Sequence, residues 1–241
     1  MDDKKTFQNE TNENILITGG YGTLGVKINE IIPNCHRPTH KEMDIQKNLM
    51  TSAYIKKINT SLIKTVIHCA ALKNEQCTKN PIEAMLTNIV GTSNVVLFCK
   101  SIGAKLVYIS TDYIFRGDRG RYSINDEVGP INYYGETKLA GEYVVKSLEN
   151  HLIIRLSFFP DIFPYEKAFV DQFATRITVT EAAKRIIDLT KKQETGIKHL
   201  SGIRRSVYEF ALSTCKGKII KPISLSDDPL IRPKDTSLEE N

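Results

Sequence analysis

Short, continuous apolar runs alternate along this chain with longer stretches whose apolar residues have helical spacing. Continuous runs are typical of strands buried on both faces, and apolar residues three or four positions apart are typical of helices with one buried face. The pattern predicts strands at 14–18, 34–37, 65–70, 105–110 and 152–157. It predicts helices near 24–32, 50–59, 82–101, 134–148 and 180–192, and a short helix at 206–212. This alternation indicates an α/β protein with a Rossmann-type doubly wound parallel sheet and helices on both faces.

The regular alternation ends near residue 157, which divides the chain into two expected parts. Residues 1–157, with part of 175–200, are predicted to form the sheet domain, and residues 158–241 a small cap on its carboxyl edge. Aromatic residues around Pro160 and Pro164 indicate that the cap is rich in loops. The first twelve residues are polar, as are those after residue 231, so both ends are expected to be loosely ordered.

A glycine-rich turn joins the first predicted strand to the first predicted helix. It reads Gly19-Gly20-Tyr21-Gly22-Thr23-Leu24-Gly25, with Gly-x-x-Gly-x-x-Gly spacing. Glycines let the backbone approach a pyrophosphate, and the following helix N-terminus supplies unpaired N–H groups and a favourable dipole. The sheet domain is therefore predicted to bind a dinucleotide, through Gly19, Gly22, Thr23, Leu24 and Gly25.

Two further segments bear on the cofactor. The third predicted strand ends in Ala70 and Ala71, whose small side chains would let the cofactor lie close. The second ends in Asn34-Cys35-His36-Arg37-Pro38, with no acidic residue to bind the ribose hydroxyls of NAD. Because an arginine suits a 2′-phosphate, Arg37 favours NADP(H), with NAD(H) as the alternative.

Three residues are candidates for catalysis. Tyr134 and Lys138 are four positions apart on a predicted helix, so they share one face. An ammonium beside a phenol is expected to lower the tyrosine pKa and so to equip Tyr134 for proton transfer. Thr111 follows the strand at 105–110, at the edge where open α/β sheets bind ligands.

These motifs together resemble the extended short-chain dehydrogenase/reductases that act on nucleotide sugars. Two stretches are most similar to the dTDP-4-dehydrorhamnose reductase family, namely residues 109–117 (Ile-Ser-Thr-Asp-Tyr-Ile-Phe-Arg-Gly) and 134–142 (Tyr-Gly-Glu-Thr-Lys-Leu-Ala-Gly-Glu). Residues 176–180 and 232–238 also resemble the carboxyl-terminal part of that family. The connection between 152–157 and 175–180 is shorter than is usual there, so the cap is expected to be a reduced one.

The resemblance implies roles for further residues. Asp44 and Ile45 would lie beside the adenine, and the amide of Asn88 would hold a backbone kink or an ordered water near the site. Tyr134 and Lys138 would also contact the cofactor. The residues expected to contact substrate are Lys73, Asp112, Tyr113 and Phe158.

The resemblance implies reduction of the 4-keto group of a nucleotide-activated deoxysugar, for deoxysugar or polysaccharide biosynthesis. In this mechanism Thr111 would bind the keto oxygen and Tyr134 would protonate it as hydride arrives. Two alternatives remain open. One is a nucleotide-sugar 4,6-dehydratase or epimerase, although Tyr113 stands where dehydratases often carry a second acid. The other is a non-catalytic NADP-binding regulatory subunit, as in methionine adenosyltransferase.

Composition narrows the partners and the compartment. The chain has 241 residues, 25% of them charged, and its net charge of +5 does not indicate a nucleic-acid partner. No apolar stretch approaches the roughly 20 residues of a membrane span, and no signal-peptide core is visible, so a cytoplasmic protein without membrane contact is expected. Neither the five cysteines nor the five histidines have metal-ligand spacing, and Cys77 alone could approach the site. A homodimer through the helices at 82–101 and 134–148 is expected from the resemblance.

Overall fold

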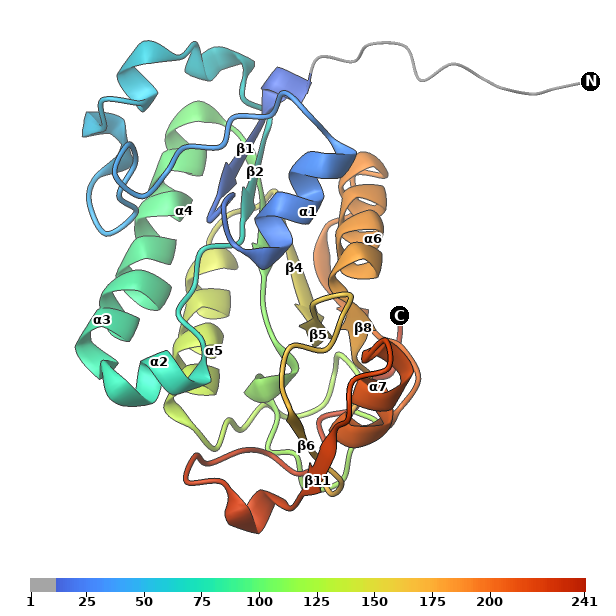
Figure 1. Ribbon diagram of the computed structural model, residues 1–241. Coiled ribbons are helices and arrows are strands. Elements are labelled where there is room, and N and C mark those ends of the chain that lie inside the picture. Colours follow the sequence, from blue (N-terminus) through green and yellow to red (C-terminus); the bar gives the residue numbers. More distant parts are fainter. Residues whose placement is uncertain (1–11) are drawn as a thin grey trace, which may run out of the picture.

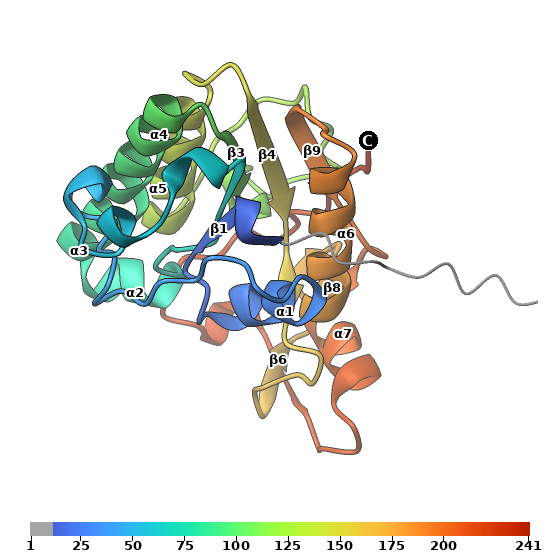
Figure 2. The same cartoon turned by 90° about the horizontal axis from the view of Figure 1, so that it is seen from above.

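The computed structural model describes residues 12–241, which are built around a five-stranded parallel sheet (Figures 1 and 2). Its strands are β1 (Ile15–Thr18), β2 (Thr65–His68), β3 (Lys105–Ile109), β4 (His151–Leu156) and β9 (Gly196–Leu200). They lie in the order β1-β2-β3-β4-β9, and every position of β2 and β3 is buried. Strands covered on both faces need few polar positions, which explains the apolar runs in the sequence. The predicted α/β architecture is confirmed.

Helices cover both faces of the sheet. On one face α1 (Thr23–Ile31) packs against α6 (Val179–Lys191), and on the other α4 (Gly91–Ile102) packs against α5 (Tyr133–Val145) (Figure 2). The period of α6 is visible in its buried residues, which are Val179, Ala182, Ala183, Ile186, Ile187 and Thr190. α6 therefore presents one mostly apolar stripe to the sheet, as its helical spacing predicted, whereas the buried residues of α5 are mostly glycine, polar or charged.

The long helix expected at 82–101 is interrupted. It consists of α3 (Pro81–Met85), a π-helical turn (Leu86–Val90) and α4, and the short helix α2 (Asn74–Lys79) precedes it. By length and composition, the stretch Pro81–Ile102 could cross a membrane, so the expectation that no stretch approaches that length is wrong. In the structure, 44% of its most apolar window is buried inside the fold, and Val95, Phe98 and Cys99 belong to the core.

The cap lies below the carboxyl edge of the sheet. It consists of α7 (Val207–Thr214) and the short strands β5 (Phe158–Phe159), β6 (Lys167–Phe169), β7 (Phe173–Ala174), β8 (Ile177–Thr178), β10 (Arg205–Ser206) and β11 (Lys221–Ile223). These strands pair two by two, as β5 with β8, β6 with β11 and β7 with β10. Phe163, Val207 and Phe210 form the centre of a separate small core.

Three local expectations were wrong. Residues 34–37 form no strand, because only His36 pairs with the edge strand β1, through hydrogen bonds of 2.8 Å to Ile15 and Ile17. Residues 50–59 form two short 3-10 turns, Leu49–Thr51 and Ile55–Lys57, instead of a helix. The edge strand β9 was not foreseen as a strand, since three of its five residues are only half-buried and its sequence gives no continuous apolar run.

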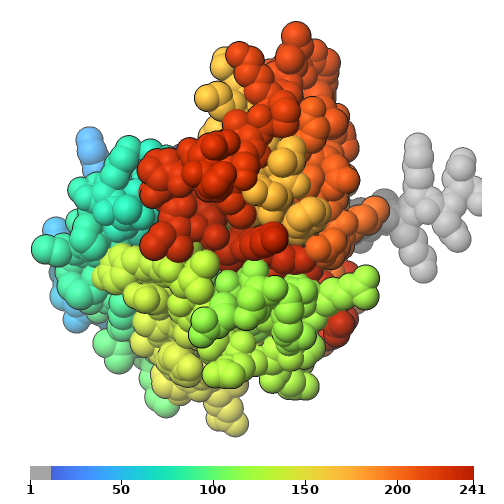
Figure 3. All heavy atoms as spheres, turned by 90° about the horizontal axis from the view of Figure 1, so that it is seen from below, coloured from blue at the N-terminus to red at the C-terminus, as the bar shows by residue number. Residues whose placement is uncertain are grey.

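The segment after residue 231 is packed, which contradicts the expected loose tail. Thr236 and Ser237 are fully enclosed, and Leu238 is buried against Phe115 and Tyr122. From below, this red segment lies against the yellow-green loops that follow β3 (Figure 3). Buried hydrogen bonds offset the polarity of the segment, so composition alone misjudges it. The expectation for the amino-terminal residues falls on 1–11, which lie outside the described residues.

Candidate functional site

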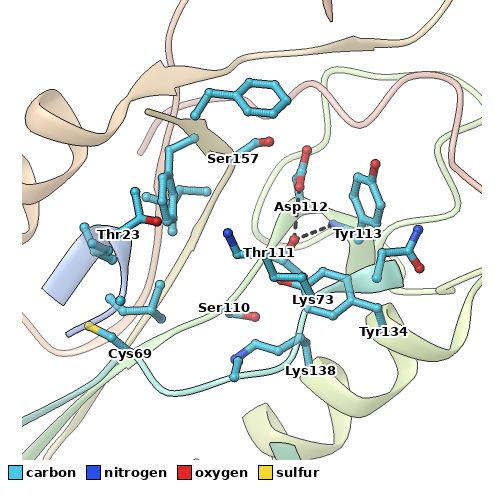
Figure 4. Close-up of a pocket in the computed structure, with 18 of the residues that line it drawn as sticks. Thr23, Cys69, Lys73, Ser110, Thr111, Asp112, Tyr113, Tyr134, Lys138 and Ser157 are labelled. Carbon is cyan, nitrogen blue, oxygen red and sulfur yellow. Dashed lines mark hydrogen bonds between the residues drawn. The ribbon is translucent and has the colours of Figure 1, made fainter. Parts of the chain in front are cut away.

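A cavity of about 490 Å³ opens at the carboxyl edge of the sheet, between the sheet domain and the cap. Figure 4 shows Thr23 of the glycine turn on one side and Thr111, Tyr134 and Lys138 on the other. The predicted site residues that line it are Gly19, Gly22, Thr23, Leu24, Gly25, Ala71, Lys73, Thr111, Asp112, Tyr113, Tyr134, Lys138 and Phe158. Segments more than 100 positions apart in sequence thus meet at one cavity, as expected for strand ends in an open α/β sheet.

The glycine turn is tightly folded against the next strand. Gly19 has a φ of 66°, and a Cβ atom there would lie 2.6 Å from the backbone nitrogen of Ala70. A Cβ atom on Gly25 would lie 2.5 Å from the carbonyl oxygen of Gly19. Gly22 caps α1 without any side-chain hydrogen bond, so the first N–H groups of the helix are free to bind a pyrophosphate. The turn therefore fits a dinucleotide by its backbone shape.

Tyr134 and Lys138 lie one turn apart on α5, whose first turn is capped by Asn132 through a 2.9 Å hydrogen bond from the N–H of Gly135. The expected fall in the tyrosine pKa is wrong for this structure. Burial raises the pKa of Tyr134 above its ordinary value, and a hydrogen bond with Thr111 opposes the rise. Burial also lowers the pKa of Lys138 to about 7. Desolvation is the largest cause of both shifts, and Tyr134 is a protonated phenol near neutral pH.

Thr111 caps the start of the 3-10 turn Asp112–Ile114, which follows β3, and its hydroxyl makes two contacts there. Its hydroxyl donates to Asp112 Oδ1 (3.1 Å) and accepts from the N–H of Tyr113 (3.2 Å), as the dashed lines in Figure 4 show. Asp112 is 1% exposed, and burial raises the pKa of its carboxyl group, whereas the charge of Arg176 opposes the rise. This turn therefore brings a hydroxyl and a carboxyl group to the wall of the cavity.

Two arginines that line the cavity were not assigned from the sequence. Arg176 is 4% exposed, and its Nη1 atom has no hydrogen-bond partner. Arg232 is held by Asp228 at 2.5 Å and touches the hydroxyl of Tyr113. The sequence did offer a signal for both arginines, because they stand in the segments 176–180 and 232–238, which resemble a nucleotide-sugar enzyme family. The Arg176 guanidinium carbon lies 5.5 Å from the ring centroid of Phe159, and its charge acts on Asp112. Because a buried donor without an acceptor is costly, its Nη1 atom is the part that suits an anionic ligand.

A second cavity of about 360 Å³ lies on the other side of the glycine turn. Ile45 and Ala70 line it, as does Gly19. Asp44 does not, because its carboxylate accepts from the N–H of Gln46 (3.0 Å) and pairs with Lys47 (3.3 Å). This cavity is apolar enough for an adenine and opens beside the turn that would hold the phosphates.

Arg37 lies at the rim next to the second cavity rather than in its lining. Its guanidinium carbon lies 4.4 Å from the ring centroid of Tyr21, and its Nη1 atom lies 3.5 Å from the carbonyl oxygen of Gly20. A Cβ atom on Gly20 would lie 2.0 Å from Arg37 Cγ, so glycine is required for this contact. No carboxylate among residues 12–241 forms an ion pair with Arg37, which leaves its charge available to a phosphate.

Asn88 lies in the π-helical turn and lines neither cavity. Its side chain accepts from the N–H of Leu72 (2.8 Å) and donates to the carbonyl oxygen of Leu72 (3.1 Å) and to Thr137 (2.9 Å). Thr137 in turn donates to the carbonyl oxygen of Tyr134 (2.8 Å). Asn88 therefore ties the loop after β2 to the helix that carries Tyr134.

No group of three metal-ligating side chains occurs in the part of the chain that the structure describes. Cys77 is buried in α2 and donates to the carbonyl oxygen of Leu72, and burial raises the pKa of its thiol. Cys69 lines the larger cavity, and burial raises the pKa of its thiol to about 12. Both thiols are therefore protonated near neutral pH and unsuited to nucleophilic chemistry.

Known proteins resemble the whole described chain or parts of it. The structure of a dTDP-4-dehydrorhamnose reductase from Bacillus anthracis in complex with NADP has a TM-score of 0.83 and 29% identity, covering 94% of this chain and 90% of that one. Methionine adenosyltransferase 2 subunit beta from Pongo abelii is 32% identical over 156 residues, 60% of this chain and 45% of that protein. A dTDP-4-dehydrorhamnose reductase from Mycolicibacterium smegmatis is 45% identical over 83 residues, 33% of this chain and 25% of that enzyme. These matches span less than half the length of either curated relative.

A family model extends the same likeness over most of the chain. The model described as the RmlD substrate binding domain matches residues 13–185, which include the glycine turn, Thr111, Tyr134 and Lys138. The matched residues carry both the cofactor turn and the candidate catalytic groups. The chain therefore belongs to the RmlD substrate binding domain family, within the superfamily of short-chain dehydrogenase/reductase-like proteins.

Proposed function

We propose that the protein reduces the 4-keto group of a nucleotide-activated deoxysugar with NADPH. One observation carries the proposal, namely a single cavity lined by the glycine turn, by Thr111, Tyr134 and Lys138, and by Arg176, whose Nη1 atom has no hydrogen-bond partner. A dinucleotide cofactor, a reducible carbonyl and an anionic group on one substrate account for all three features together. The family and the NADP-bound relative support the same assignment.

The side chains divide the chemistry between them. A bound nicotinamide cofactor supplies the hydride, and the free N–H groups at the start of α1 hold its phosphates. Thr111 binds the keto oxygen by turning its hydroxyl away from Asp112. Tyr134 gives its proton to that oxygen, a role that requires the protonated phenol present near neutral pH. Lys138 places a positive charge beside the phenolate that forms.

Arg176 is proposed to bind the diphosphate of the substrate. Its side chain is buried at the cavity wall with the Nη1 atom lacking a hydrogen-bond partner, and a forked cation matches phosphate oxygens. The test is titration of the NADP-loaded protein with dTDP. Arg176→Met is expected to weaken dTDP binding by about tenfold or more. Arg119→Met, which removes the same charge from an exposed site paired with Asp126, is expected to leave it unchanged.

The reductase itself is tested by mixing the purified protein with NADPH and dTDP- or UDP-linked 4-keto-6-deoxy sugars. NADPH oxidation that depends on the sugar is the expected result. Tyr134→Phe is expected to keep NADPH binding and to lower kcat by about 10²–10⁴-fold, because it removes the proton donor. Unchanged turnover in this variant would remove Tyr134 from the mechanism.

A second candidate function is a non-catalytic NADP-binding subunit. The observation behind it is the match to methionine adenosyltransferase 2 subunit beta over 60% of this chain. Tight NADPH binding without oxidation on any keto sugar would favour this function. A dehydratase or epimerase is disfavoured by Tyr113, which occupies the place of the second acid, and would be recognised by NAD that stays bound through purification.

A further inference from the structure

The side chain of Lys138 packs against the face of an aromatic ring. Its Nζ atom lies 4.0 Å from the ring centroid of Tyr108, a residue of β3 that is fully buried. Tyr108 also donates a hydrogen bond of 3.3 Å from its hydroxyl to the carbonyl oxygen of Lys138. One side chain thus contacts both the ammonium and the backbone of the same lysine.

Gly141 makes room for this ring. A Cβ atom at Gly141 would lie 2.2 Å from the hydroxyl oxygen of Tyr108 and 2.9 Å from its Cζ atom. The glycine lies within α5, where glycine costs stability relative to alanine by about 0.5–1 kcal/mol. The close approach of Tyr108 to α5 therefore depends on a residue that the helix itself disfavours.

Among the ionisable groups around Lys138, the carboxylate of Glu142 favours the ammonium by its charge and raises its pKa. Glu142, one turn along α5, is engaged by Arg155 (2.8 and 3.0 Å) and by Ser110 (2.6 Å), and no carboxylate among the described residues forms an ion pair with Lys138. The pKa values of the Cys69 and Cys77 thiols are raised by burial, so both are neutral.

The phenol of Tyr108 and the imidazole beside it are also uncharged near neutral pH. Burial raises the pKa of Tyr108 well above its ordinary value. His68, whose ring centroid lies 5.7 Å from that of Tyr108, has a pKa lowered to about 3 by burial and by the charge of Lys138. The π face of Tyr108 therefore favours the ammonium at close contact, in addition to the charge of Glu142, which forms no ion pair with Lys138.

We propose that Tyr108 is a positioning residue whose π face holds the Lys138 ammonium, in its charged form, at the point where α5 presents it to the cavity. A cation over an aromatic face is stabilised by the ring quadrupole, and the effect is strongest away from water. The kinetic consequence rests on the reductase function proposed above, whereas the state of the ammonium does not.

The test weakens the quadrupole of the ring at position 108 while keeping the shape of the ring nearly unchanged. Wild type is compared with variants that carry phenylalanine or 3,4,5-trifluorophenylalanine at position 108, since fluorination weakens the quadrupole. The pKa of Lys138 is read by ¹³C NMR of protein labelled at lysine Cε, with the signal assigned through Lys138→Met. Trifluorophenylalanine at position 98, where Phe98 is 1% exposed in the core, is the matched control.

Phenylalanine at position 108 is expected to keep the pKa of Lys138 close to that of wild type. The fluorinated ring is expected to lower that pKa by about one unit, a tenfold change in the protonation equilibrium. The high-pH limb of kcat/KM should then move to lower pH by the same amount, because less of the lysine is charged.

An unchanged Lys138 titration with the fluorinated ring at position 108 would overturn the proposal, since a ring that acts by packing alone is indifferent to its quadrupole. A shifted titration in a protein without keto-sugar turnover would support the role of Tyr108 and count against the reductase. The two proposals therefore fail separately.

Discussion

Thr236 donates a hydrogen bond to the buried carboxylate of Asp112, which precedes it by 124 positions. The bond ties the end of the chain to the turn that carries Thr111. Nearby, Asn132, the cap of α5, donates to the carbonyl oxygen of Ile231 (3.0 Å), and Gln172 donates to that of Pro233 (3.1 Å). Residues 231–236 therefore tie the cap to the turn capped by Thr111 and to the start of α5.

Replacing Thr236 with valine keeps the shape of the side chain but removes the hydrogen bond to Asp112. Because Asp112 is 1% exposed, we expect the free energy of unfolding to fall by about 1–3 kcal/mol in urea titrations. Thr236→Ser retains the hydroxyl, so its free energy of unfolding should be close to that of wild type. Equal losses in the two variants would show that packing of the methyl group, and not the hydrogen bond, stabilises this contact.

Gly25→Ala is expected to damage cofactor binding through the backbone of the turn. The added Cβ atom would lie 2.5 Å from both the carbonyl oxygen of Gly19 and the Cα atom of Gly20. The turn must then open, and NADPH affinity measured by fluorescence should fall by about tenfold or more, ~1.4 kcal/mol. Gly129→Ala is the control, since nothing lies within 4 Å of its added Cβ atom. Equal NADPH affinity in the two variants would argue against this turn as the phosphate site.

His68 links Thr18, which precedes the glycine turn, to Thr92 of α4 as a neutral imidazole. Thr92 donates its hydroxyl proton to the carbonyl oxygen of Asn88 (2.7 Å), so its oxygen accepts from His68 Nε2–H (3.0 Å). Nδ1 then accepts from the hydroxyl of Thr18 (2.5 Å). These partners assign the Nε2–H tautomer, and a charged ring would require the Thr18 hydroxyl to accept from Nδ1–H instead of donating to it.

This neutrality makes stability depend on pH. Burial lowers the pKa of His68 to about 3 from its ordinary 6.5, so between these values the unfolded state binds a proton that the native state does not. The contribution is full above pH 6.5 and is lost toward pH 3, with a slope of roughly 1.4 kcal/mol per pH unit. We expect His68→Gln to reduce this slope in urea titrations below pH 6.5, whereas His40→Gln, at a side chain 74% exposed, should not. If the free energy of unfolding had the same pH slope in wild type and His68→Gln, His68 would be charged in the native protein.

Arg37→Ser is expected to weaken NADPH binding and to spare NADH. Arg37 is stacked on Tyr21 without an acidic partner, so it can meet the 2′-phosphate that only NADPH carries. The loss of a charge-assisted contact should lower NADPH affinity by about tenfold to a hundredfold. Arg37→Lys keeps the charge but loses the planar stack, so its NADPH affinity should lie between those of wild type and Arg37→Ser. A parallel loss of NADH affinity would instead indicate damage to the turn itself.

The local sequence determined the elements and much of the site. Apolar runs, a glycine turn and the spacing of Tyr134 and Lys138 depend on neighbours a few positions away, so periodicity and backbone geometry reveal them. The predicted strand at 34–37 failed because it pairs only at His36, on the open side of β1. The predicted helix at 50–59 failed because tertiary packing of Leu49 and Ile55 into the core prevails over helical spacing.

Only the tertiary structure decided what surrounds each group. Burial raises the pKa of Tyr134 although Lys138 is one turn away, because desolvation depends on residues from every packed element. The charge of Arg176 near Asp112, the ring of Tyr108 against Lys138 and the bond from Thr236 to Asp112 join residues distant in sequence. The sequence thus determined which chemical groups reach the carboxyl edge of the sheet, and long-range packing determined their charge states and their partners.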